Sequence, residues 1–268
     1  PTANYVNYYG MQNGYPINDM TKADAESGYD PTHPWKNRDP RFYKTIMFDG
    51  VKWRNTGGAG GTAELFTGGR ESEEANEKKG CFTAYMNSKL CPQLMNTFDG
   101  YKENNIMILS LMRLADVYLM YAEATAVGYN SPKGKAATYS LTAEEALNKI
   151  RERAGVAPVL EKFLGSTADF LSELRRERAV ELSFEGFRFT DLRRWMLLTQ
   201  YPYTLKTKIE FDRADPNNYN YDAPEENAIK NLREVVLIER KYTDRHYWYP
   251  LPKKDVSMYE GFYQNPGW

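Results

Sequence analysis

Apolar side chains at helical spacing fill the middle of the chain. The stretch NIMILSLMRLADVYLMYAEATAV, residues 105–127, is apolar on nearly every face that a helix would have. This pattern predicts a helix over about 106–127 that lies at the centre of a helical bundle. Arg113, Asp116 and Glu123 interrupt the stretch, and three charges in such a span argue against a membrane-spanning helix.

Three more helices are expected further along the chain. Thr142 and Glu145 form a capping box ahead of ALNKIRERA, and Gly155 is well placed to end that helix. The segment GSTADFLSELRRERAVELSFEG begins with Ser, Thr and Asp capping chemistry, and its helix is predicted to end at Gly186. A short fourth helix follows over about 189–198. Short links predict antiparallel pairs similar to tetratricopeptide pairs, although a clean repeat of about 34 residues is not seen.

Residues 1–104 are mostly loop by composition, with Gly, Pro, Asn and Asp throughout, as in NGYPIND and GYDPTHPWKNRDP. One exception is the β-rich stretch 41–53, in which Asp49-Gly50 predicts a hairpin turn. The glycine-rich run 57–69 lacks the Gly-Lys-Ser/Thr ending of a phosphate loop, so we interpret it as flexible loop.

After the helical segment 105–198, the chain is predicted to return to loop over residues 199–233. EVVLIE and HYWYPLP then have the composition of two short strands, joined by RKYTDR. The chain ends in FYQNPGW, a turn-rich tail. We therefore predict one mainly α region over 1–268, with long loops, a few short strands and a C-terminal tail over 199–268.

The chain is nearly neutral, with 35 Lys and Arg against 36 Asp and Glu. Nucleic-acid-binding proteins need an excess of cations to displace phosphate counterions, so no nucleic-acid partner is expected. Aromatic residues reach 14%, led by 21 tyrosines. Tyrosine combines an apolar face with a polar tip, which suits both a core and a wet binding surface.

Cys81 and Cys91 lie ten residues apart and could form a disulfide or remain two thiols; the sequence leaves both open. His33 and His246 are far from them, so no metal site is expected, and no motif suggests a cofactor. The chain starts PTANYVNYYG, without a signal peptide or a lipid-modified cysteine. We therefore expect it to be a piece of a longer protein.

Four glutamates recur at every fourth position of the third predicted helix: Glu173, Glu177, Glu181 and Glu185. This spacing places their Cβ atoms about 5–6 Å apart on one face, close to the carboxyl separation of a retaining glycosidase. Catalytic carboxylates must flank a bond from two sides, however, whereas these project the same way from one rod. We therefore predict a structural ion-pair network and no enzyme activity.

Arginines could supply the counter-charge to these glutamates. Three lie three residues from a glutamate, and others on neighbouring helices could reach across. No Gly-x-Ser-x-Gly or His-Glu-x-x-His motif is present to suggest another active site. The arginines near in sequence are Arg176, Arg178 and Arg188, and those on other helices are Arg113, Arg151, Arg153, Arg193 and Arg194.

Several of these motifs occur together in one family. DPRF, LMRLADVYLMYAEA, ALNKIRERAGV, RRERAVELSFEGFRFTDLRRW, YPLP and QNPGW follow in that order, and the chain resembles the C-terminal half of the SusD/RagB family. The resemblance implies a SusD-like fold of tetratricopeptide-like helix pairs. It also implies a lipid-anchored protein on the extracellular face of the outer membrane that captures oligosaccharide for a SusC-like TonB-dependent transporter. The lipid anchor would precede this chain.

The resemblance further implies that loop aromatics, not the scaffold motifs, hold the ligand. A sugar ring offers an apolar C–H face to a flat aromatic ring and a rim of hydroxyls to polar side chains. The resemblance places the loop-rich segment 1–104 on the ligand side. Within it, the first candidate ring is Trp35 in the proline-rich loop before DPRF, the second is Tyr15 and the third is Trp53. The predicted glycan-binding residues are Trp35, Tyr15, Trp53, Asn37 and Arg38, whereas Trp195, Trp248 and Trp268 are expected to be packing residues.

Three alternatives to oligosaccharide capture stay open at the level of sequence. A member of the same family could capture peptides, which would favour an open groove with backbone pairing. A helical-repeat adaptor would instead bind a protein partner through its concave face, although the apolar helices here do not favour it. A glycoside hydrolase is the third, and sustained sugar release would identify it.

Overall fold

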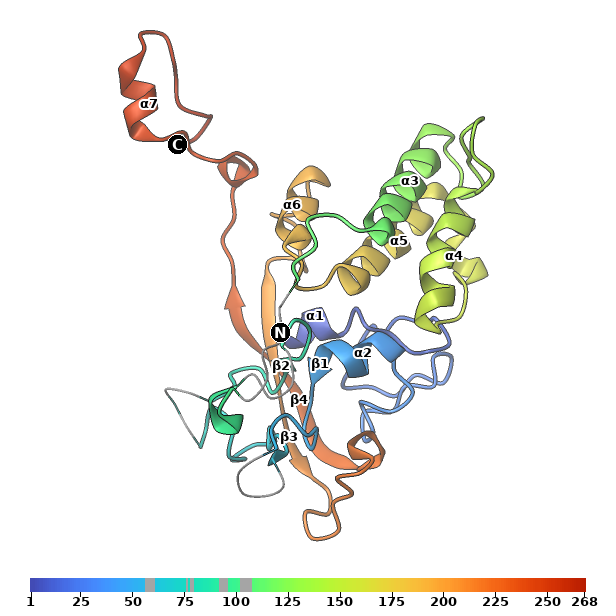
Figure 1. The fold of residues 1–268 in the computed structure, drawn as a ribbon, viewed down its shortest axis with the longest axis vertical. Helices are drawn as coiled ribbons and strands as arrows, with labels where there is room; N and C mark the ends of the chain where they lie inside the picture. The colour runs from blue at the N-terminus through green and yellow to red at the C-terminus, as the bar shows by residue number, and fades with distance from the viewer. Residues whose placement is uncertain (56–60, 76, 78–79, 92–95, 102–107) are drawn as a thin grey trace.

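The computed structural model describes residues 1–55, 61–75, 77, 80–91, 96–101 and 108–268 (Figure 1). Helix exceeds strand, as predicted, and the strands form two-stranded sheets in the described part of the chain. No helix within the described residues is long and apolar enough to cross a membrane. The helices are α1 (Ala3–Val6), α2 (Pro40–Thr45), α3 (Leu114–Gly128), α4 (Ala143–Ala154), α5 (Thr167–Glu181), α6 (Phe187–Arg194) and α7 (Lys253–Met258).

Helices α3, α4 and α5 pack together around one apolar core (Figure 1). Leu119 of α3, Leu147 of α4 and Phe170 of α5 are fully buried in it. The predicted capping box is confirmed: the Thr142 hydroxyl accepts from the Glu145 backbone N–H, and the Glu145 carboxylate accepts from that of Thr142. Local chemistry read from the sequence thus defines the start of α4.

Helix α3 is shorter and less central than predicted. It begins at Leu114 rather than near residue 106, and residues 108–113 are not helical; positions 106 and 107 lie outside the described residues. Leu119 and Ala122 are buried, but Met120 on another face is 41% exposed. The expectation of a helix buried all round was wrong because α3 packs mainly against α4 and α5, which leaves another of its faces open to solvent.

Helix α5 ends at Glu181, five residues before the predicted stop. Gly186 has a φ of +87° and is the N-cap of α6, so it starts the next helix rather than ending the previous one. Residues 182–186 form the turn between the two helices. Helix α6 covers Phe187–Arg194, close to the fourth helix that the sequence predicts.

A long two-stranded antiparallel ribbon occupies much of the segment predicted to be loop and tail. Strand β3 (Leu205–Arg213) pairs with β4 (Ile229–Glu239), so the loop expected over 199–233 was wrong for 205–213 and 229–233, whereas the rest of that range contains no strand. In β3, Thr207, Ile209 and Phe211 alternate with less buried residues, which is the half-buried strand pattern. EVVLIE is confirmed as strand, but HYWYPLP is not, since its first residues belong to the 3₁₀ helix Asp244–Tyr247.

The hairpin predicted over 41–53 is also absent. The Asp39 carboxylate accepts a hydrogen bond from the Arg41 N–H at 2.9 Å, and Pro40 takes the first helical position, so α2 forms there instead. Strand β1 (Ile46–Met47) pairs with β2 (Met86–Asn87), far along the chain. Of the glycine-rich run, positions 57–60 lie outside the described residues.

The N-terminal segment and the β3–β4 ribbon share a second apolar core. Trp35 stacks on Phe48 with ring centroids 4.9 Å apart and meets Phe211 of β3 edge-on at 5.2 Å. Val180 of α5 belongs to the same cluster, so α5 contributes to both cores. Cys81 and Cys91 are free thiols in this structure.

Candidate functional site

The structure places Trp35, the first predicted sugar platform, inside the protein. Its side chain has no exposed surface and is enclosed by Phe48 and Phe211. Its indole N–H points to the Tyr85 hydroxyl at 3.4 Å. A ring in this position offers no face to a ligand, so the expectation of an accessible platform is corrected: the proline-rich loop folds inward because an indole gains more from burial than from solvent.

Arg38 is also buried, and its side chain forms hydrogen bonds with the backbone. Its guanidinium donates to the carbonyl oxygens of Tyr9, Pro34 and Val6, at 2.6 to 3.0 Å. These bonds hold the N-terminal segment against the loop and leave Arg38 unable to contact the rim of a sugar. Asn37 beside it is exposed, with a φ of +54°, and stays a predicted ligand contact.

Tyr15 and Trp53 are partly exposed, and each ring already has a cation over it. The Lys162 ammonium lies 4.3 Å from the centre of the Tyr15 ring, and the Arg54 guanidinium lies 5.1 Å from that of Trp53. The rings of Tyr15 and Trp53 do not stack on each other. Both stay predictions as ligand residues, but the structure does not gather the five predicted residues into one pocket.

The C-terminal tryptophans also depart from expectation. Trp248 is 56% exposed and Trp268 is 43% exposed, although both were expected to be packing residues. They lie in the C-terminal segment that projects from the body of the molecule beyond β4 (Figure 1). Trp195 fits the expectation better, since its indole donates to the Glu123 carboxylate at 2.8 Å and Arg194 stacks on its ring.

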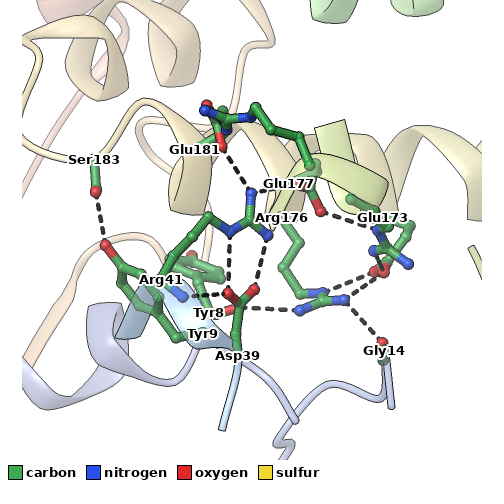
Figure 2. A network of polar contacts seen from close by, with 12 residues as sticks. Tyr8, Tyr9, Gly14, Asp39, Arg41, Glu173, Arg176, Glu177, Glu181 and Ser183 are labelled. Carbon is green, nitrogen blue, oxygen red and sulfur yellow. Dashed lines mark hydrogen bonds and ion pairs between the residues drawn. The ribbon is translucent and has the colours of Figure 1, made fainter. Parts of the chain in front are cut away.

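The glutamates Glu173, Glu177, Glu181 and Glu185, which we call the carboxylate column, take part in a buried ion-pair network, part of which is drawn in Figure 2. Arg151 of α4 bonds to Glu173 and, at 3.0 Å, to Glu177. Arg41 of α2 lies 2.5 Å from Glu177 and 2.9 Å from Glu181. The network therefore joins α2, α4 and α5, and the structural interpretation of these glutamates is confirmed.

Glu181 and Glu185, at the C-terminal end of the column, are also paired with cations. Arg113, just before α3, bonds to Glu181 at 2.6 Å and to Glu185 at 2.8 Å. Lys89 reaches Glu185 at 2.6 Å. Each glutamate thus meets at least one cation from another part of the chain, which offsets the repulsion expected between carboxylates four residues apart.

Neighbouring charges keep Glu173 and Glu177 ionised. Burial alone would raise the pKa of Glu177, but the charges of Arg41 and Arg151 outweigh burial and lower the pKa to about 2. In the same way, Arg176 and Arg151 outweigh burial at Glu173 and lower its pKa. A general acid needs a pKa near the working pH, so these groups are poorly suited to donate a proton.

Four of the arginines expected to supply counter-charge do not pair with these glutamates in the described part of the chain: Arg178, Arg188, Arg193 and Arg194, the last of which pairs with Glu123 and Asp191. Arg178 turns instead to Asp116 at 2.7 Å and Asp191 at 3.0 Å. Arg193 donates to the Tyr247 carbonyl oxygen at 3.1 Å. Arg188 lies three residues after Glu185 in sequence, but its side chain lines a cavity together with Phe189 and Tyr203.

That cavity, which we call the aromatic cavity, has a volume of about 420 Å³ and is the candidate ligand site. Its volume falls in the range of small-molecule sites. The walls come from α1, the turn before α6, α6 itself, the start of β3 and the chain just after β4 (Figure 1). Its aromatic lining consists of Tyr5, Phe184, Phe189, Tyr203 and Tyr242, and its cations are Arg188, Lys206 and Arg240.

The aromatic rings of this cavity are held by the scaffold. The Tyr5 hydroxyl donates to the Ala179 carbonyl oxygen of α5 at 2.6 Å, and its ring lies 5.8 Å from that of Phe184. The Arg188 guanidinium lies 5.6 Å from the centre of the Tyr203 ring. Phe189 remains 41% exposed. Contacts with neighbouring groups thus hold partly open rings in place, which lowers the ordering cost of binding.

Two other hollows are less suited to a sugar. A groove of about 600 Å³ beside Glu181 and Glu185 is rich in cations, but Arg41, Arg113 and Arg153 there already pair with carboxylates. Another of about 600 Å³ next to α4 has no aromatic side chain in its lining. Of these three hollows, the aromatic cavity alone combines several rings with cations that form no ion pair among the described residues.

Sequence reasoning missed the aromatic cavity for a clear reason. Its residues are scattered over the first five positions, 182–206 and 240–242, and only tertiary packing brings them together. A weak signal did exist, since FRF in the motif EGFRFTDL places one phenylalanine on each side of Arg188 at the start of α6. The motif was interpreted wholly as scaffold.

A model of the SusD family matches the chain over residues 1–268. No curated protein matches the sequence. Among solved structures, a SusD-like protein from Bacteroides fragilis NCTC 9343 is 22% identical with a TM-score of 0.70, covering 100% of this chain and 47% of that one. A structure named BT4246 is 21% identical with a TM-score of 0.69, covering 100% of this chain and 44% of that one.

These similarities extend over the whole of this chain but only part of its relatives. The chain spans less than half the length of either solved structure. At such identities the structural match shows a shared fold, and it confirms the prediction of a SusD-like architecture.

Proposed function

The chain belongs to the SusD family, and we propose that it is part of a nutrient-binding protein of the cell surface that captures oligosaccharide. The observation that carries the proposal is the aromatic cavity. Phe189 and Tyr203 present partly open rings at its wall, and such rings suit the C–H face of a pyranose. Tyr242 and the neighbouring cations offer hydrogen bonds to its hydroxyl rim.

The proposal includes delivery to a SusC-like TonB-dependent transporter in the outer membrane, with the protein lipid-anchored on the extracellular face. This part rests on family membership alone. In this protein the chain would supply the scaffold of α3, α4 and α5 and the aromatic cavity.

We propose binding without catalysis. Glu173 and Glu177 lie on one face of α5 and Glu185 lies in the turn after it, and at all three the neighbouring cations outweigh burial and lower the pKa. A glycosidase needs one carboxyl group with a raised pKa to protonate the leaving oxygen. The groups on α5 have the opposite property, which supports a structural role.

The test is calorimetric titration of the intact protein with a panel of oligosaccharides and of extended peptides. Binding of an oligosaccharide, weakened about tenfold by Phe189→Ala or Tyr203→Ala, is the expected result, because one lost ring contact contributes about 1 kcal/mol. Tyr129→Ala, which removes an exposed ring outside the cavity, is the matched control.

Two results would overturn the proposal. Peptide binding in the absence of any oligosaccharide binding would assign the protein to peptide capture. Continuous release of reducing sugar from a bound oligosaccharide would show an enzyme and contradict the non-catalytic assignment.

A further inference from the structure

The three cations of the aromatic cavity have only neutral partners. Lys206 of β3 donates to the carbonyl oxygens of Tyr203 and Leu205, at 3.1 and 3.0 Å. Arg240, just after β4, donates to the Tyr242 hydroxyl at 2.7 Å. Arg188 of α6 makes a long contact of 3.5 Å to the Arg175 carbonyl oxygen.

No carboxylate balances this charge at the cavity. The described lining residues include no Asp or Glu, and within the described chain none of the three cations forms an ion pair. The contrast with the carboxylate column is sharp, because there Arg41, Arg113 and Arg151 each contact two glutamates. A concave surface with one sign of charge attracts ligands of the other sign.

The cations also lie close enough to repel one another. Burial lowers the pKa of Lys206, and the charges of Arg240 and Arg188 lower it further. Three positive groups around one hollow therefore raise the energy of the empty site. A bound anion would relieve that repulsion and would also form charge-assisted hydrogen bonds, which are stronger than neutral ones.

From this arrangement we infer that the aromatic cavity takes an acidic oligosaccharide, one whose sugar rings carry carboxylate or sulfate groups. The inference rests on the proposed function and narrows its ligand class. The pyranose face lies on Phe189 or Tyr203, and the anionic substituent lies among Arg188, Lys206 and Arg240. A neutral sugar would satisfy the rings but would leave the three charges without a counter-ion.

Matched pairs of oligosaccharides test the inference on the intact protein. One pair is a hexuronate oligosaccharide and the same chain after reduction of its carboxyl groups; the other is a sulfated oligosaccharide and its desulfated form. The acidic member of at least one pair is expected to bind at least tenfold more tightly, and its advantage is expected to fall as salt rises.

Two variants test whether the preference for acidic oligosaccharides arises at the aromatic cavity or from cations elsewhere on the surface. Lys206→Met and Arg240→Met keep most of the aliphatic stem but remove the charge, and each is expected to reduce the acidic preference at least fivefold. Lys149→Met removes an exposed cation of α4, remote from the cavity lining, and should leave the preference unchanged. Thermal unfolding of each variant checks that it is folded.

The outcomes distinguish this inference from the proposed function. Equal affinity for both members of each pair, with loss of binding in Phe189→Ala, overturns the acidic ligand but leaves oligosaccharide capture in place. Failure of every oligosaccharide to bind overturns both. Preference for an Asp- and Glu-rich peptide over the acidic sugars would assign the cations to a peptide ligand and also overturn both.

Discussion

The Arg41 guanidinium lies 2.5 Å from the Glu177 carboxylate, joining two residues 136 positions apart in the chain. Both side chains are almost fully enclosed. Arg151 contacts the same carboxylate from α4 at 3.0 Å, so Glu177 is the point where α2, α4 and α5 meet electrostatically. The charges of this protein are therefore part of its interior as much as of its surface.

Removing Glu177 should destabilise the fold strongly. In Glu177→Ala, Arg41 and Arg151 both lose this buried carboxylate as a partner. Breaking a buried ion pair in this way costs about 3–5 kcal/mol. Chemical denaturation would measure the free energy of unfolding. Glu152→Ala removes an exposed carboxylate of α4 whose one ion pair among the described residues is with Lys149, and it should change the free energy of unfolding by less than about 1 kcal/mol. Similar losses for the two variants would contradict the buried network.

Stability should fall at acid pH, with Glu177 among the causes. Its pKa is about 2 in the folded protein and near 4.5 when unfolded, so the unfolded state binds the proton more readily. The stabilisation is full above about pH 4.5, falls as the pH drops below that value, and is gone near pH 2. Urea midpoints between pH 7 and 3 would show the decline.

Glu177→Gln provides the control for that pH dependence, since it keeps the shape and removes the titrating group. The midpoint of this variant should be lower at pH 7 and should decline less between pH 5 and 3. A decline as steep as that of the parent protein would show that other carboxylates account for the acid sensitivity.

Trp35→Ala should affect folding rather than ligand affinity. The indole is enclosed by Phe48 and Phe211, and removing a buried aromatic side chain costs about 3–5 kcal/mol. The comparison variant is Trp248→Ala, because that indole is largely exposed and its loss should cost little. An affinity change in Trp35→Ala at full stability would restore the sequence-based prediction of a sugar platform there.

Gly186→Ala should destabilise the protein by about 1 kcal/mol. Gly186 adopts a φ of +87°, where an L side chain is strained, although no atom lies within 4 Å of the added Cβ. Gly128→Ala offers a matched control, because it also has open space but no positive φ and lies in α3. The control should be neutral or slightly stabilising. Equal effects at the two positions would remove the conformational explanation.

The two cysteines should react at different rates with a thiol reagent under native conditions. Cys91 is exposed, whereas Cys81 is partly buried and its Sγ donates to the Tyr85 carbonyl oxygen at 3.2 Å. A Cys91→Ser variant should retain only the slow phase. Absence of any free thiol in protein from the oxidising cell surface would show that the two form a disulfide there instead.

Local chemistry in the sequence predicts the parts of this fold that depend on neighbours in the chain. The capping box of Thr142 and Glu145 starts α4 as expected, and the apolar spacing of α4 and α5 supplies faces that pack. Predictions failed where distant strands decided the outcome. The stretch 205–213 forms β3 because β4 is available to pair with it, and no local signal reports that partner.

The same division applies to the candidate site. The spacing of Glu173 and Glu177 is enough to predict a shared helix face and the need for counter-charges. It does not reveal that Arg188 points away to the aromatic cavity, because the direction of a long side chain depends on what surrounds it.

The family, the helical scaffold and the structural role of the glutamates on α5 could be predicted from the sequence, since these depend on spacing along one element and on the order of motifs. Which aromatic rings face solvent depended instead on how distant segments pack. Trp35 turned out to be core and Phe189 cavity wall because burial is a property of the assembled packing. Rings of similar chemistry differ in role according to the surfaces that other parts of the chain bring against them.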